Sequence, residues 1–144
     1  MRIKPNPDKV VECIIDRAKR LGRITKLAEV ARKAAPKGSE KVIETVEEYL
    51  AGIPCDEVLA LVLEYVDLYM CYCEYEGEDI KILIKILRMK CDELRRELAD
   101  YIMDFLAIIT NNDVIGEAAQ ILWERDVLVH EDFTMRRGKG LNPP

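Results

Sequence analysis

The chain has 144 residues, a hydrophobic fraction of 49%, a charged fraction of 34% and a formal net charge of −5 at pH 7. A chain of this size is expected to form one domain that buries roughly 70% of its unfolded surface. No uninterrupted apolar run reaches the ~18 residues that a membrane-spanning helix needs, which excludes a membrane span. Because the net charge is negative, non-specific binding of nucleic acid by the whole surface is also disfavoured.

The composition is biased in two further ways. Gln120 is the only glutamine and charged residues are abundant, a bias that resembles proteins from very hot habitats. The N-terminus has no apolar signal segment, so we expect a cytoplasmic location. There, cysteines usually serve as small buried hydrophobic residues, although disulfides are also known in intracellular proteins of hyperthermophiles. The five cysteines are Cys13, Cys55, Cys71, Cys73 and Cys91.

Helical periodicity predicts three helices in the first part of the chain, over residues 8–21, 25–35 and 39–51. Asp8, Thr25 and Ser39 stand at their starts, and these side chains commonly cap helix N-termini. Glycine or proline follows each expected end. The helices are therefore predicted to be short and joined by tight turns.

A fourth helix is predicted from Pro54 to about Glu76, with apolar residues on nearly every side. We expect it to be the centre of the core. A sixth helix is predicted from Val114 to about Leu128. No convincing strand pattern is present, and residues 127–129 together with Phe133 could form at most a short strand.

Between the fourth and sixth predicted helices, residues 78–109 have apolar side chains at alternating steps of four and three. This spacing predicts one long fifth helix. At ~1.5 Å per residue such a helix spans on the order of 45 Å. The expected fold class is all-α, a six-helix bundle in which helices four and five form a long antiparallel pair. Residues 1–133 form the single domain, and residues 134–144 form an extended basic tail.

The middle of this heptad seam is narrow, as expected for contact with one neighbouring helix. The sequence predicts an oligomer interface there, and packing within the chain is the alternative. The predicted interface residues are Leu87, Cys91, Leu94 and Leu98.

Charge is segregated along the chain. Residues 1–38 contain eleven Lys and Arg against four Asp and Glu, whereas residues 39–80 contain one against twelve. The basic part predicts phosphate contacts with nucleic acid, and the alternative is a solvated face or a surface that docks on the acidic third of the same or a neighbouring chain. The full basic set is Arg17, Lys19, Arg20, Arg23, Lys26, Arg32, Lys33 and Lys37, with Arg136, Arg137 and Lys139 in the tail.

The segment ERDVLVHEDF, residues 124–133, contains the only histidine of the chain, five positions after an arginine. This R-x4-H spacing resembles the motif of HEPN-domain ribonucleases, which cleave RNA without a metal. The resemblance implies that Arg125 would stabilise charge on the phosphate and that His130 would act as acid or base at the ribose 2′-hydroxyl. A histidine at the surface or packed against a partner is the other interpretation.

No metal-ligand spacing and no phosphate-cradling glycine loop occur, so neither a metal nor another cofactor is predicted. The leading hypothesis is a non-enzymatic helical assembly or adaptor protein. It would self-associate through its long helix, as a homo-oligomer or with a helical partner protein, and contact nucleic acid through its basic N-terminal third. A ribonuclease is the alternative hypothesis.

Overall fold

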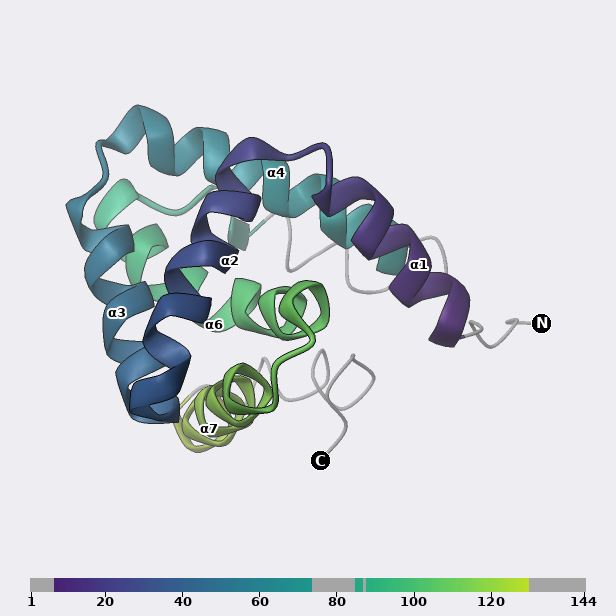
Figure 1. Ribbon diagram of the computed structural model, residues 1–144. Coiled ribbons are helices and arrows are strands. Elements are labelled where there is room, and N and C mark those ends of the chain that lie inside the picture. The colour runs from purple at the N-terminus through teal and green to yellow at the C-terminus, as the bar shows by residue number, and fades with distance from the viewer. Residues whose placement is uncertain (1–6, 74–84, 87, 130–144) are drawn as a thin grey trace.

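Figure 1 shows the computed structural model of the chain, which describes residues 7–73, 85–86 and 88–129. In these ranges all regular structure is helical, which confirms the all-α prediction. None of the helices described there is long and apolar enough to cross a membrane. The helices are α1 (Pro7–Ala18), α2 (Gly22–Ala34), the 3-10 helix η1 (Ala35–Lys37), α3 (Ser39–Gly52), α4 (Cys55–Cys73), α6 (Cys91–Thr110) and α7 (Asp113–Val129).

Helix α6 lies at the centre of the fold. It contacts α1, α2, α3, α4 and α7, which surround it in Figure 1. Every residue from Leu98 to Leu106 is buried, so this part of α6 is covered on all sides. The prediction that the fourth helix is the centre of the core is therefore wrong. Helix α4 is apolar around most of its circumference, but Leu59 and Leu63 on it are 54% and 59% exposed.

The predicted long helix over residues 78–109 is interrupted. Met89 and Lys90 are not helical, and Lys90 has an extended backbone (φ −71°, ψ 154°) immediately before α6 begins. The Arg95 guanidinium donates a 2.6 Å hydrogen bond to the carbonyl of Ile53, which holds the start of α6 against the turn between α3 and α4. The heptad pattern of the sequence continues through the break.

Residues 78–84 and Leu87 lie outside the described part of the chain, and the antiparallel pairing of the fourth helix with one long fifth helix is not confirmed. What the structure shows is α6 in contact with α7, α3 and α4. The other predicted helices are close to those observed. Residues 127–129 belong to α7, so the suggested short strand there is wrong.

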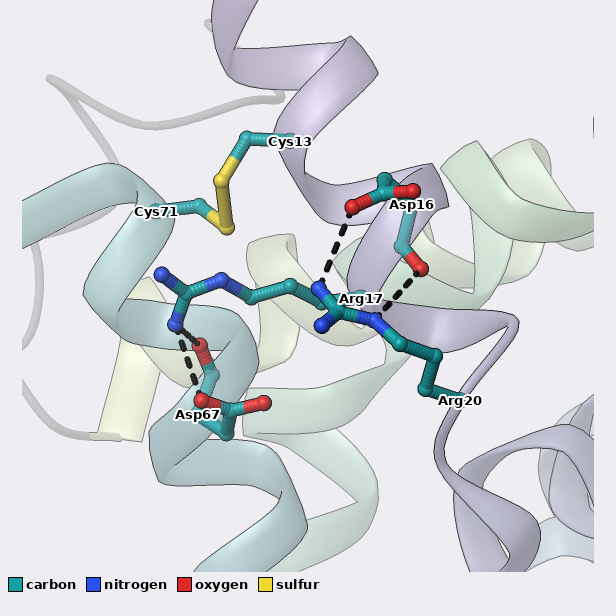
Figure 2. A network of polar contacts seen from close by, with 6 residues as sticks. All are labelled: Cys13, Asp16, Arg17, Arg20, Asp67 and Cys71. Carbon is teal, nitrogen blue, oxygen red and sulfur yellow. Dashed lines mark hydrogen bonds and ion pairs between the residues drawn. A yellow bond between two sulfur atoms is a disulfide. The ribbon is translucent and has the colours of Figure 1, made fainter.

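Helices α1 and α4 are joined by two matched cross-links (Figure 2). Cys13 forms a disulfide with Cys71, and Arg17 forms a 2.8 Å ion pair with Asp67. Because both pairs are four residues apart on their own helices, the cross-links lie one helical turn apart, and the two helices run antiparallel. The Arg17 guanidinium also donates a 3.0 Å hydrogen bond to the Asp67 carbonyl.

A side chain from α4 caps the N-terminus of α2. The Glu64 carboxylate accepts hydrogen bonds from the backbone N–H groups of Ile24 at 2.8 Å and Arg23 at 3.2 Å. Thr25, predicted as the cap, instead lies inside the helix, where its hydroxyl donates to the Leu21 carbonyl at 2.6 Å. Helix α2 begins three residues earlier than predicted because its cap is supplied from a distant part of the sequence.

We expect Glu64→Ala to lower the free energy of unfolding by about 0.5–2 kcal/mol, the usual effect of removing an N-terminal cap. The Glu64 side chain is only 14% exposed, so water replaces the lost acceptor poorly. Glu64→Gln keeps one acceptor oxygen and should lose less stability than Glu64→Ala. Urea unfolding of the three proteins measures the difference. Equal stability of Glu64→Ala and the parent would contradict the capping role.

Candidate nucleic-acid interface and disulfides

Two disulfides join helices that are distant in the sequence. Cys13 pairs with Cys71 across 58 positions, and Cys55 pairs with Cys91 across 36. They use four of the five cysteines and leave Cys73 as the remaining one. The interpretation of the cysteines as small buried hydrophobic residues is therefore wrong for these four, and the alternative, disulfide formation, is what the structure contains.

Three of the predicted nucleic-acid-binding arginines are paired with acidic side chains. Arg17 pairs with Asp67 at 2.8 Å, and Arg20, in the turn after α1, pairs with Asp16 of that helix at 3.1 Å (Figure 2). The Arg23 guanidinium lies 3.7 Å from the Glu64 carboxylate. Arg17 and Arg23 thus contact α4, which lies in the acidic part of the same chain, as the docking alternative to phosphate contact describes.

The remaining cations of α2 and η1 are directed to solvent. Lys26, Arg32, Lys33 and Lys37 are exposed, and none of them forms an ion pair with a residue that the structure describes. Lys26 and Lys33 are seven positions apart, so they share the exposed side of α2 two turns apart. We call these four residues the α2 basic face. Glu29 is exposed between the two lysines and is the acidic residue of this side.

Arg125, predicted as a catalytic residue, lies on α7 and contacts α3. Its Nη2 atom is 2.8 Å from one carboxylate oxygen of Glu40 and 3.0 Å from the other. Partial burial raises the pKa of the nearby Glu47 above the usual value of a glutamate; the positive charge of Arg125 opposes this rise and the negative charge of Glu40 adds to it. Arg125 is thus already engaged with an acidic surface in this structure.

The other catalytic candidate, His130, and the tail residues Arg136 and Arg137 lie outside the described residues. The distance and orientation between Arg125 and His130 are therefore not described, and the ribonuclease hypothesis stays a prediction. Among the residues that are described, no group of three or more His, Cys, Asp or Glu side chains could hold a metal ion.

The predicted oligomer interface is used within the chain. Leu94 is 5% exposed and Leu98 is fully buried in the core. Cys91 is bonded to Cys55, and Leu87 lies outside the described residues. Leu94 and Leu98 are therefore covered by other residues of the same chain.

Among the described residues, the large apolar side chains that are exposed to solvent lie on α4. Leu59, Leu63 and Met70 are 54%, 59% and 42% exposed, and their spacing places them on one side of this helix. The sequence alone does not separate them from core residues, because α4 is apolar on almost all sides.

A small hollow of about 10 Å³ between α2, α3 and α4 has room for about one water molecule.

Sequence reasoning also missed the acidic partners Glu64 and Asp67. One signal was present: the spacing of four between Cys13 and Arg17 equals that between Asp67 and Cys71. Two helices that pair antiparallel through one cross-link bring the second pair together as well. This match of spacings is informative only once α1 and α4 are known to be neighbours. From the sequence alone, the paired arginines cannot be distinguished from the unpaired cations.

Comparison with known proteins gives no relative: the chain matches no family model, no curated protein and no solved structure.

Proposed function

We propose that this chain is a non-enzymatic helical protein that binds nucleic acid through the α2 basic face. The proposal rests on one observation: some basic residues in the first part of the chain are paired with carboxylates, and others are not. Arg17, Arg20 and Arg23 are held by carboxylates, whereas the four residues of the α2 basic face are exposed and are not ion-paired to any described side chain.

A cluster of exposed, unpaired cations supports phosphate binding because lysine and arginine release counterions when they approach the nucleic-acid backbone. Such contacts fix the position of a protein on its nucleic acid and carry no sequence information. At physiological salt, repulsion from acidic side chains that lie farther away than a Debye length of about 8 Å is largely screened. Binding is therefore expected to be local, salt-sensitive and independent of sequence.

The direction of approach also follows from the structure. A helix N-terminus is ordinarily a good site for a phosphate, because its free N–H groups and dipole attract anions. In α2 that end is occupied by the Glu64 carboxylate. A phosphate backbone would therefore lie along the side of α2, over Lys26 and Lys33, and not at its end.

The proposal is tested by measuring the affinity of the full chain for labelled duplex DNA and single-stranded RNA across a salt series. We expect Lys26→Ala and Lys33→Ala each to weaken binding and to reduce the slope of log K against log [salt] by about 0.7–0.9. Glu29→Gln removes a negative charge from the same side and should strengthen binding. Lys9→Ala, an exposed lysine on α1, is the matched control and should leave the slope unchanged.

Two results would overturn the proposal. One is the absence of binding to either nucleic acid at low salt. The other is an equal loss of affinity in Lys9→Ala, Lys26→Ala and Lys33→Ala, because it would show that net charge and not the α2 basic face decides binding.

Self-association stays a prediction, and two of the residues predicted for its interface, Leu94 and Leu98, are buried within the chain. The solution mass of the chain at several concentrations measures it directly.

A further inference from the structure

The two disulfides have different surroundings. Cys13 and Cys71 lie inside their helices, and Cys71 is fully buried. Cys55 and Cys91 are instead the first residues of α4 and α6, and Cys55 is exposed. Both sulfur atoms of the second disulfide are therefore next to the N-terminus of a helix, where the dipole favours negative charge.

A cation is also in contact with this disulfide. The Nη2 atom of Arg95 lies 3.8 Å from the Cys55 sulfur. The guanidinium is held in place by the 2.6 Å hydrogen bond to the Ile53 carbonyl and by a 3.1 Å ion pair with Asp92. The Arg95 side chain is 22% exposed, so its position is fixed by packing as well as by polar contacts.

Acidic residues in the first turns of α4 and α6 oppose this effect, because their negative charges disfavour a thiolate. Asp56 and Glu57 follow Cys55, and Asp92 and Glu93 follow Cys91. All four are exposed, so water and salt screen their effect on the sulfur atoms. Arg95 is in direct contact with the sulfur and is largely shielded from solvent. It is therefore the charge that acts most strongly on Cys55.

Surroundings of this kind favour a cysteine thiolate over the thiol. A disulfide whose reduced form is stabilised in this way is opened more readily than one whose cysteines gain nothing from reduction. The Cys13–Cys71 disulfide differs from Cys55–Cys91 in two respects. Cys71 is fully buried, which restricts access for an attacking thiolate, and Arg17, one helical turn from Cys13, is ion-paired with Asp67 at 2.8 Å.

We propose that Cys55–Cys91 is a redox-active disulfide that exchanges with small-molecule thiols, whereas Cys13–Cys71 is a structural one. In the first step a thiolate attacks the Cys91 sulfur, the Cys55–Cys91 bond breaks, and Cys55 leaves as a thiolate beside Arg95. A mixed disulfide now joins Cys91 to the small thiol. A second small thiolate attacks the outer sulfur of this bond and releases Cys91. The balance is one protein disulfide and two thiols converted into one protein dithiol and one small disulfide.

The test uses the full oxidised chain carrying Cys73→Ser, which prevents exchange with the fifth cysteine. The protein is equilibrated with mixtures of reduced and oxidised glutathione, the free thiols are alkylated, and peptide mass spectrometry measures the reduced fraction of each disulfide. We expect Cys55–Cys91 to be half reduced in mixtures that leave Cys13–Cys71 closed. Opening of Cys13–Cys71 first, or of both together, would overturn the proposal.

Burial alone could protect Cys13–Cys71, so the charge of Arg95 is tested separately. Arg95→Gln should shift the midpoint of Cys55–Cys91 roughly three- to tenfold toward more reducing mixtures, because the Cys55 thiolate loses its cation. Arg95→Lys keeps the charge and should shift it less. Arg96→Gln removes the same charge from the exposed neighbouring position and is the matched control. An unchanged midpoint in Arg95→Gln, or easier opening, would contradict the role of this arginine.

Discussion

Replacing both Cys13 and Cys71 by serine should lower the free energy of unfolding by about 4 kcal/mol, the value expected for a disulfide that closes a loop of this length. For a chain of this size the loss corresponds to a decrease of the midpoint temperature on the order of 10–15 °C. The reason is largely the unfolded state, which gains the freedom that the bridge had removed. Thermal unfolding followed by circular dichroism measures the change.

Cys73→Ser is the matched control for this experiment, since it removes a cysteine from the same helix without opening either disulfide. It should leave the midpoint within a few degrees of the parent. If the double replacement cost less than about 1 kcal/mol, the pairing of α1 with α4 would have to be maintained in the unfolded chain by other contacts, and the argument from loop closure would be wrong.

The second large effect is expected at Leu98, which is fully buried in α6. Leu98→Ala should lower the free energy of unfolding by about 2–5 kcal/mol, because it removes buried methyl groups and leaves a cavity in a region covered on all sides. Leu63→Ala on α4 is the matched control. Its side chain is 59% exposed, so the loss should be within about 0.5 kcal/mol.

The same pair of variants separates a core position from an oligomer interface. A core leucine changes the stability of the folded chain and leaves its solution mass unchanged, whereas an interface leucine changes the mass and leaves the fold intact. Sedimentation of Leu98→Ala under native conditions therefore checks the placement of this residue. A lower solution mass with unchanged stability would show that Leu98 belongs to the oligomer interface that the sequence predicts, and not to the core.

Helix ends that depend on local signals could be predicted from the sequence. Gly38 has φ +103°, a conformation that glycine adopts easily, and the helix begins at Ser39 as predicted. The N-cap residue is Gly38 and no side chain makes a cap hydrogen bond there, so the predicted cap by Ser39 is wrong. The start of α2 could not be predicted, because its cap is Glu64, about forty residues further along the chain. The break at Met89 and Lys90 could not be predicted either, because the heptad pattern continues through it.

The candidate site was predictable only as a set of residues. The sequence identifies every cation of the basic part, but its charge alone does not show which side chains meet carboxylates. That division depends on the antiparallel register of α1 and α4, which brings Arg17 to Asp67. Disulfide pairing depends on the same spatial information, because two cysteines must come within a few ångströms before they can bond.

The order of the four bonded cysteines along the chain is Cys13, Cys55, Cys71, Cys91, and each disulfide encloses one end of the other. The two covalent loops therefore overlap and share α4. A protease that cuts one peptide bond anywhere between Cys13 and Cys91 would leave two pieces still joined through sulfur. Such a nick would stay invisible on a denaturing gel until a reductant is added, and the oxidised chain would keep its full mass after damage that would split its reduced form.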